Sequence, residues 1–382
     1  MEQQKREQMK LSITKSEFLR GLGRIQSIVE KRNSMPILAN TLIEAPVKGK
    51  EGLLHLAATD LEVGIRSQHA ADVSEAGGLT VSAKKLFEIV RELPDEKIEL
   101  SSTPNSYLEI RCNRSRFTLA GTAAEEYPTL PEFNPEKTVP IPADLLSSMI
   151  ERTMYAASLD ETRYNLNGVY LEVLGETGAI RLVATDGHRL ACIDREIDGD
   201  TSALASGVII PRKGLGELKR LVDEPDAEEI ELAFANNNGL ARKGGVTLVM
   251  RLIEGEFPNY GQVIPKELTR HLILPSDLLV QAVRRVALLS SERSRAVKLE
   301  LGDGQLVISS SNPDLGDARE ELDIDYAGDA LTIGFNAKYL IDAINAVQSK
   351  EIRFSFQDEL SPSRLSPPDD EKTIAVVMPM RI

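Results

Sequence analysis

The stretch ATDGHR at residues 184–189 has two counterparts in the chain, ATDLEV at residues 58–63 and SSNPDL at residues 310–315. The distance between matching positions, from 59 to 185 and from 185 to 311, is 126 residues in both cases. Equal spacing of similar stretches is the sequence signature of an internal repeat. The chain is therefore predicted to contain three copies of one structural unit.

The sequences around the three copies match as well. Each copy follows a short apolar run of the kind that is typical of a strand. Each copy also precedes the apolar pattern of a helix, and the three predicted helices carry a leucine at the matching point: Leu86, Leu215 and Leu340. Every unit is thus predicted to contain a strand, the repeated stretch and a helix.

A second predicted helix opens each unit. In the first unit, apolar residues recur at three- and four-residue steps from Phe18 to Val29. The second and third units open with PADLL at residues 142–146 and PSDLL at residues 275–279, where proline precedes the helix and aspartate lies in its first turn. Alternating runs between the helices, such as residues 108–112, predict half-buried antiparallel strands.

These patterns divide the chain into domains. The predicted domains are residues 9–133, 134–265 and 266–382, with a linker at each of the two boundaries. Residues 1–8 are polar and unpatterned, so we expect a disordered extension. Each domain is predicted to be α+β, with two helices packed on antiparallel sheet.

Composition excludes several classes of protein. The chain has 382 residues, 42% of them hydrophobic, with 26 glycines and 19 prolines, so a globular fold is expected rather than a collagen-like or disordered one. Cys112 and Cys192 have no second cysteine or histidine at ligand spacing, so we expect no metal, no cofactor and no disulfide framework. No apolar stretch approaches the roughly 18 residues of a membrane span, and a reducing cytoplasmic location is expected.

The charge is distributed unevenly along the chain. The formal net charge of −14 argues against a protein that grips nucleic acid with its whole surface. The six predicted helical segments nevertheless carry 19 Lys or Arg and 10 Asp or Glu residues, a net charge of +9, which leaves −23 for the rest. A solvated helix face explains any single helix equally well. Six basic helices in three like repeats would face a common polyanion. The segments are residues 15–32, 83–93, 143–153, 211–222, 276–295 and 337–350.

Several motifs run through all three units after Met9. The stretch TDGHR and the C-terminal run are the most specific of them. The motifs are MPILAN at residues 35–40, RYNLNG at 163–168, ATDGHRL at 184–190, EFPNY at 256–260, IGFN at 333–336 and VVMPMRI at 376–382. With them the sequence resembles the bacterial sliding clamp family, the beta subunit of the replicative DNA polymerase III.

The resemblance implies a head-to-tail homodimer, in which two chains of three domains close a six-domain ring around duplex DNA with helices lining the hole. In that family the ring tethers the polymerase to its template and has no catalytic site. The expected partners are double-stranded DNA without sequence specificity, a second copy of this chain, the alpha subunit of DNA polymerase III, the clamp loader, and other polymerases and repair proteins with short peptide motifs. The expected location is the cytoplasm, at the nucleoid during replication.

The resemblance also implies a hydrophobic pocket for partner peptides. Flexible methionine side chains suit a pocket that accepts several partners. For the C-terminal run itself, an edge strand ending in the core stays open as the alternative. Gln262 stands where the family often has arginine, which affects partner preference at that rim. The implied lining is Leu166, Thr185, Gly187, His188, Arg189, Leu190, Pro258, Val263, Val376, Met378, Pro379, Met380 and Arg381.

DNA contacts are implied at five positions. Phosphate and water-mediated contacts without base readout are expected, because a sliding ring must bind every sequence alike. As isolated surface residues these side chains could equally face solvent, and Asp160 stands where some relatives have an uncharged DNA-contacting residue. The implied residues are Arg32, Arg163, Tyr164, Arg212 and Lys213.

The ring joint is implied between the first and third domains. Phe117 and Leu119 alternate, so both would face one side of an edge strand, with an ordinary core face as the alternative. Two unlike patches that meet twice close a ring, and ion pairs around an apolar centre leave it openable. The implied residues are Arg114, Arg116, Phe117 and Leu119 against Leu288, Leu289, Asp314 and Glu320.

Two other classes of function stay open. A monomeric groove-type DNA binder or interaction scaffold predicts a mass near the 42.0 kDa of one chain. A hydrolase would use Thr185, Asp186 and His188 as nucleophile, acid and base. The first and third copies lack this combination, so the stretch is better explained as a structural turn elaborated once for binding.

Overall fold

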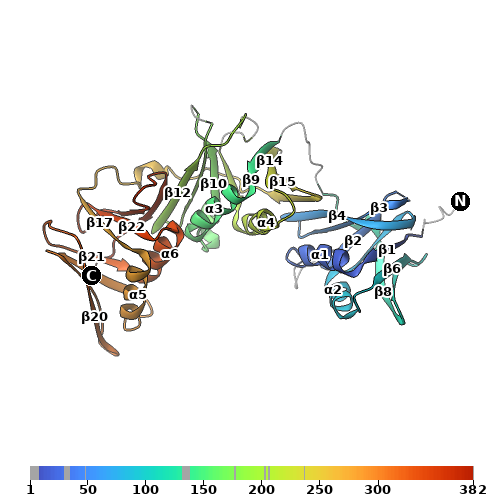
Figure 1. Cartoon of the computed structure of the whole chain (residues 1–382), viewed down its shortest axis with the longest axis horizontal. Coiled ribbons are helices and arrows are strands. Elements are labelled where there is room, and N and C mark those ends of the chain that lie inside the picture. The colour runs from blue at the N-terminus through green and yellow to red at the C-terminus, as the bar shows by residue number, and fades with distance from the viewer. Residues whose placement is uncertain are drawn as a thin grey trace. The chain divides into compact units, whose positions relative to one another are not determined.

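The computed structural model describes residues 8–29, 35–47, 49–130, 138–175, 178–201, 204, 207–235 and 237–381 (Figure 1). Most of the predicted disordered extension, the first predicted linker and Arg32 lie outside the described residues. The chain divides into two compact units, residues 1–143 with 216–251 and residues 144–215 with 252–382. Each unit is described by itself.

All six predicted helices are present, but the first and the fifth end earlier, at Gln26 and Ala287, than the segments 15–32 and 276–295. Three of them begin with a side-chain cap, in which Thr14, Ser82 or Asn336 accepts a hydrogen bond from a backbone amide of the first turn. In the first unit α1 packs against α2, and in the second α5 packs against α6. The helices are α1 (Lys15–Gln26), α2 (Ala83–Glu92), α3 (Ala143–Thr153), α4 (Arg212–Asp223), α5 (Ser276–Ala287) and α6 (Ala337–Val347).

One antiparallel sheet of 12 strands forms the first unit. Its order is β1-β6-β7-β8-β5-β2-β3-β4-β16-β15-β14-β9, and a further pairing of β1 with β4 closes its first eight strands on themselves. The strands are β1 (Lys10–Thr14), β2 (Asn40–Ala45), β3 (Gly49–Thr59), β4 (Val63–Glu75), β5 (Gly77–Ser82), β6 (Lys97–Ser102), β7 (Tyr107–Cys112), β8 (Ser115–Ala123), β9 (Val139–Pro142), β14 (Glu229–Ala235), β15 (Asn238–Lys243) and β16 (Val246–Arg251).

Two antiparallel sheets form the second unit. The larger has the order β13-β10-β11-β12-β24-β23-β22-β17, and the smaller has the order β20-β19-β18-β21. The strands are β10 (Gly168–Val173), β11 (Ile180–Thr185), β12 (Arg189–Arg195), β13 (Val208–Pro211), β17 (Arg270–Pro275), β18 (Ala296–Gly302), β19 (Gln305–Asn312), β20 (Gly316–Asp323), β21 (Leu331–Asn336), β22 (Glu351–Phe356), β23 (Ser363–Ser366) and β24 (Thr373–Val377).

The predicted α+β class, with helices on antiparallel sheets in a threefold repeat, is confirmed. The sheets continue across the boundaries between repeats. Strand β16 pairs with β4, which joins the second repeat to the first, and β12 pairs with β24, which joins the second repeat to the third. The domain boundaries at residues 133 and 265 therefore stay predictions.

The repeated stretch forms the same turn in its first two copies. The hydroxyl of Thr59 donates to the carbonyl oxygen four residues on (3.0 Å), and the carboxylate of Asp60 accepts from the amides two and three residues on (2.9 and 2.6 Å). Thr185 (2.7 Å) and Asp186 (2.9 and 3.0 Å) make the same bonds. Side-chain bonds of this kind hold a tight turn between two strands. The sequence signature of the repeat thus encodes a turn.

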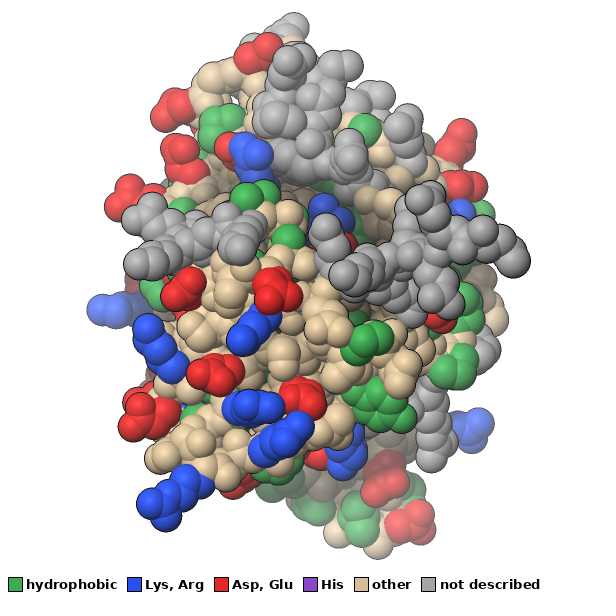
Figure 2. All heavy atoms as spheres, turned by 90° about the vertical axis from the view of Figure 1, so that its right-hand side faces the viewer, with side chains coloured by type: hydrophobic (Ala, Val, Ile, Leu, Met, Phe, Trp, Pro, Cys, Tyr) green, Lys and Arg blue, Asp and Glu red, His purple; other side chains and the backbone are tan. Residues whose placement is uncertain are grey.

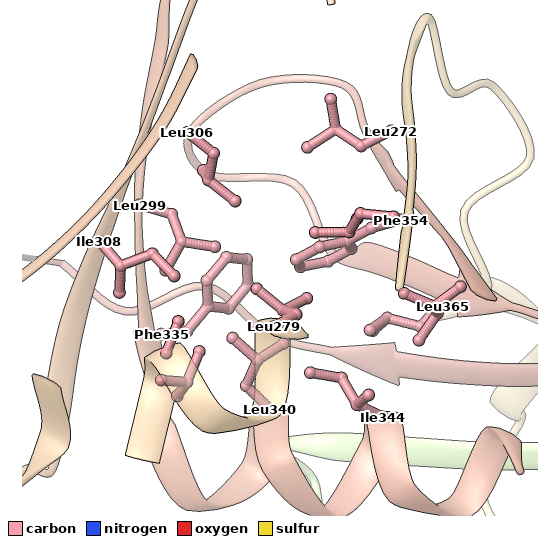
Figure 3. Packing of buried hydrophobic residues seen from close by; sticks show 14 of the residues in the cluster. Leu272, Leu279, Leu299, Leu306, Ile308, Phe335, Leu340, Ile344, Phe354 and Leu365 are labelled. Atoms are coloured by element: carbon pink, nitrogen blue, oxygen red, sulfur yellow. The ribbon is translucent and has the colours of Figure 1, made fainter. Parts of the chain in front are cut away.

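A core of aliphatic and aromatic side chains fills the third repeat (Figure 3). Phe335 and Phe354 are fully buried with ring centroids 5.8 Å apart, and Leu340 and Ile344 of α6 point toward them. Leu365 of β23 belongs to the same cluster. Because β23 and β24 belong to the larger sheet, this core fixes the C-terminal strand against α6.

Lys243 is a buried cation that caps α4. Its side chain is 3% exposed, and its ammonium donates to the carbonyl oxygens of Val222 (2.6 Å) and Glu224 at the helix end. Lys243→Met should lower the free energy of unfolding by about 2 kcal/mol, because two charge-assisted bonds to otherwise unpaired helix carbonyls are lost. Urea denaturation followed by circular dichroism measures this change. Lys266→Met, at an exposed loop position, is the control, and equal midpoints for both variants would contradict the capping role.

Candidate functional site

The turn between β11 and β12 presents two residues to solvent. Gly187 and His188 are exposed, whereas Thr185 and Arg189 at the two ends of the turn are buried. Gly187 has a φ of +87°, a conformation that side chains with a Cβ rarely adopt. A Cβ there would also lie 3.1 Å from Nη1 of Arg163. The turn therefore needs glycine, and it offers its backbone and the His188 ring to a ligand.

Strand pairing brings the C-terminal run beside this turn. In the pairing of β12 with β24, Leu190 lies opposite Val376. The amide of Met378 donates to the carbonyl of His188 (2.9 Å), and the amide of Met380 donates to the carbonyl of Gly334 (2.8 Å). Residues 186 to 190 positions apart in the chain thus become neighbours, and the half-buried side chains of Met378, Pro379 and Met380 follow directly after the strand.

An apolar cluster includes the paired residues Leu190 and Val376 of the larger sheet. It consists of the buried residues Val183, Leu190, Cys192 and Val376. Partly buried side chains pack against it, and these include the predicted Val263 together with aromatic residues that the sequence analysis did not select. The additional side chains are Tyr170, Phe257, Tyr260, Ile264 and Ile374.

Three of these residues form an aromatic group under the loop that follows Phe257. Tyr170 and Phe257 are stacked, with ring centroids 5.0 Å apart and planes 7° apart. Tyr260 packs against both rings at 6.4 and 6.3 Å. Pro258 is exposed in this loop, and Val263 donates its amide to the carbonyl of Tyr260 (2.9 Å). The aromatic group thus holds the loop against the apolar cluster.

Arg189 is held inside the protein rather than presented to solvent. Its side chain is 8% exposed, and its guanidinium pairs with the carboxylates of Asp186 (3.1 Å) and Asp342 (2.6 Å). It also lies 4.6 Å from the ring centre of Tyr339 and 5.2 Å from that of Tyr155. A buried cation between two carboxylates and two rings fixes the turn to α6. Arg189 therefore supports the surface from within.

The structure brings most of the predicted pocket residues into this region of the second unit. Leu166 is buried at the end of a short 3₁₀ helix, η5 (Glu161–Leu166). Arg381, which follows Met380 in the C-terminal run, is exposed. Tyr339 of α6, stacked 6.0 Å from His188, was missed by the sequence analysis. For Phe257 and Tyr260 a signal existed, because both belong to the EFPNY motif, but the motif alone gives no direction for their side chains.

The predicted DNA contacts that the structure describes lie on η5 and at the start of α4. Arg163 and Tyr164 are exposed on η5, and Arg163 donates to the carbonyl of Asp186 (3.3 Å). The amide of Arg212 donates to the carbonyl of Asn167 (3.0 Å), which ties the first residue of α4 to the end of this segment. Helix N-termini attract phosphate, so arginine there suits an anion. Asp160 caps η5 by accepting from the amide of Thr162 (3.0 Å).

Part of the positive charge counted on the helices is neutralised within the first unit. Arg24, nearly buried on α1, donates to Glu224 (2.9 Å) and Asp226 (2.7 Å), and Arg20 pairs with Asp226 (3.0 Å) and with Glu17 (2.9 Å). A count of charges from sequence treats these arginines as free. Their ion pairs join the first repeat to the second instead, which corrects the simple sum of helix charges.

The two predicted halves of the ring joint lie at or near strand edges, with Leu288 and Leu289 just after the end of α5. Residues 115–120 of β8 pair only with β7, and β20 is the last strand of the smaller sheet. Phe117 is 39% exposed and Leu288 is 77% exposed. On β20, Glu320 accepts from Arg285 of α5 (2.9 Å). Exposed apolar side chains beside unpaired strand edges are the ingredients of an interface.

Charged side chains surround the edge of β8. Figure 2 shows the end of the first unit near β6 and β8, with Lys and Arg interspersed among Asp and Glu. Arg116 and Arg111 both pair with Glu109 of β7, at 2.8 and 3.2 Å. This part of the surface is therefore mixed in sign, which suits ion pairs at a rim better than binding of a polyanion.

The described residues contain no group of three His, Cys, Asp or Glu side chains arranged to hold a metal ion. A membrane-crossing helix is likewise not found in the part of the chain that the structure describes. Both described cysteines are buried and unpaired.

Comparison with known proteins gives one consistent result. Family models of the DNA polymerase III beta subunit match residues 9–131 (N-terminal domain), 140–259 (central domain) and 261–381 (C-terminal domain). The beta sliding clamp of Caulobacter vibrioides is 38% identical over 379 residues, 98% of this chain and 100% of that protein.

Solved structures give the same result. A clamp of C. crescentus, described with polyethylene glycol at a proposed beta-motif tethering region, has a TM-score of 0.91 at 36% identity. The clamp of Bartonella birtlesii bound to griselimycin has a TM-score of 0.93 at 34% identity. Each alignment covers 98% of this chain and 100% of the other.

Proposed function

The chain belongs to the family of bacterial beta sliding clamps, the beta subunits of DNA polymerase III, and from this premise we propose which of its surfaces serve that function. It is a replication processivity factor that keeps the polymerase on DNA, and it is not an enzyme. The turn at residues 185–189 is then proposed as a binding element, and Thr185, Asp186 and His188 are not the catalytic residues of a hydrolase.

The β12–β24 surface is the proposed site for partner peptides. The observation that carries this proposal is the pairing of β24 with β12, because it aligns the methionine-bearing tail with the exposed turn and the apolar cluster. Half-buried methionines and aromatic rings adapt to different apolar side chains. The partners are the alpha subunit of DNA polymerase III, the clamp loader, and other polymerases and repair proteins. The clamp of B. birtlesii is described bound to griselimycin, and we propose that this chain binds griselimycin at the same β12–β24 surface.

Two copies of the chain are proposed to close a ring. The edge of β8 in one copy would meet β20 in the other, with Phe117 and Leu119 against Leu288 and Leu289. Arg114 and Arg116 would pair with Asp314 and Glu320 at the rim. Pairing of two sheet edges gives backbone hydrogen bonds in addition to apolar contact. Each ring would contain two such joints, with the three predicted domains of each chain between them.

DNA would pass through this ring and touch its helices. Arg163, Tyr164, Arg212 and Lys213 are the proposed contacts, because η5 and the start of α4 lie together. Arg32 is proposed from the resemblance alone. The location proposed for the protein is the cytoplasm, at the nucleoid during replication.

The ring is tested by the salt dependence of its hold on DNA. Clamps placed by a bacterial clamp loader on closed circular DNA should stay bound in 1 M salt, where screening reduces the Debye length to about 3 Å and phosphate contacts fail. Cutting the circle once should release them, because the link is topological. Gel filtration of the DNA complexes measures retention. Equal salt release from intact and cut circles would contradict the ring and favour a monomeric groove binder.

A further inference from the structure

We propose that Tyr260 is a positioning residue for the β12–β24 surface, held by an ionic network of Glu172, Arg181 and Asp194. Through it the network fixes the loop that carries Pro258 and Val263. The inference rests on the proposed peptide-binding function of this surface. Tyr260 acts through the loop and is not assigned a contact with the ligand.

The network spans three strands of the larger sheet. Arg181 of β11 donates from Nε and Nη2 to the two carboxylate oxygens of Asp194 on β12, both at 2.6 Å. Its third nitrogen, Nη1, donates to the hydroxyl of Tyr260 (3.2 Å). The same hydroxyl donates to the carboxylate of Glu172 on β10. The tyrosine hydroxyl is thus held by two opposite charges at once.

Burial strengthens this arrangement. The side chains of Arg181, Glu172 and Asp194 are 26%, 25% and 17% exposed, so solvent screens their interactions only in part. Burial, followed by the hydrogen bond to Glu172, raises the pKa of Tyr260 above its ordinary value. The phenol therefore keeps its proton and donates to Glu172 throughout the physiological pH range.

The ring of Tyr260 transmits this anchoring to the loop. The ring packs against Tyr170 and Phe257. The backbone carbonyl of Tyr260 accepts a hydrogen bond from the amide of Val263 in a single 3₁₀ turn, η7 (Tyr260–Gln262). The loop is short and rests on the sheet through these rings. Displacement of Tyr260 would therefore move Val263 relative to the apolar cluster against which it packs.

The test compares two tyrosine-to-phenylalanine variants in the second unit. Tyr260→Phe removes the hydroxyl that the network holds and keeps the ring. Tyr326→Phe removes a hydroxyl that donates to the carbonyl of Asp329 (2.8 Å), in the core of the third repeat. Isothermal titration with griselimycin should give an affinity about tenfold weaker for Tyr260→Phe, the effect of losing one bond to charged groups, and near wild type for Tyr326→Phe.

Two further readouts separate positioning from general destabilisation. Amide exchange in Tyr260→Phe should quicken at residues 259–264 and stay unchanged at residues 376–378. In a Val263→Ala background, Tyr260→Phe should add little further loss of affinity, because both changes act through one loop. Wild-type affinity in Tyr260→Phe, an equal loss in Tyr326→Phe, or additive losses with Val263→Ala would overturn the proposal. Failure of the wild-type protein to bind griselimycin would instead contradict the proposed surface itself.

Discussion

A variant that lacks residues 378–382 is expected to bind griselimycin on the order of 100-fold more weakly than the full chain, since it loses the centre of the contact surface. The tail supplies Met378, Pro379 and Met380, and two of its amides donate to the carbonyls of His188 and Gly334. Without it the exposed turn stands alone beside the apolar cluster. Fluorescence anisotropy with labelled griselimycin measures the affinity.

The control for this deletion is Leu360→Ser, which changes an exposed apolar side chain elsewhere in the second unit. Leu360→Ser should bind as the wild type does, and both variants should keep the mass of two chains in solution, because the tail lies on neither strand edge of the joint. Unchanged affinity after the deletion would refute the assignment of the surface.

Phe117→Asp is expected to split the ring into single chains of 42.0 kDa. A carboxylate at this position would be buried without a partner between two sheet edges, and the loss of an aromatic anchor adds to that cost. Together these effects amount to about 4 kcal/mol at each joint, or roughly 1,000-fold in dissociation constant. Sedimentation velocity measures the mass, and retention on closed circular DNA should be lost in parallel.

The fold of the variant should survive, because Phe117 is 39% exposed in the single chain. Leu53→Asp is the matched control, since Leu53 is 40% exposed on β3 and lies away from the edge. Leu53→Asp should remain dimeric. A dimer that persists in Phe117→Asp would place the joint elsewhere.

Local structure could be read from the sequence because its causes are local. The Thr-Asp pair at the start of each of the first two turns makes the same hydrogen bonds at residues 59–63 and 185–189. Helix positions followed from apolar spacing and from the residues that begin each helix. Helix α5 ends at Ala287, before the end of the basic segment 276–295. The charges of that segment continue past the helix, because charge does not mark where a helix ends.

Relations between repeats could not be read in this way. Nothing in the periodicity of β16 states that it pairs with β4, and nothing in the charge of Arg24 states that Glu224 is its partner. Arg189 was expected to line the pocket, but its carboxylate partner Asp342 lies 153 residues away and holds the guanidinium inside. Such contacts depend on tertiary packing, which one sequence does not display.

The family resemblance predicted some of the contacts between repeats that periodicity could not predict. It implied a common site for His188, Leu190 and Val376, which the structure brings together with the tail. It assigned no role to Tyr170 or Tyr260, because their role depends on how three rings stack and on a network that crosses three strands.

Because sheets run from one repeat into the next, the chain is not expected to fold as separate pieces when it is cut at the boundaries between repeats. A fragment that contains only the middle repeat would expose one edge of β16 and one edge of β12. Exposed strand edges promote aggregation. Fusion tags, split-protein halves and circular permutants are better joined at strand ends away from the proposed ring joint than at the boundaries between copies.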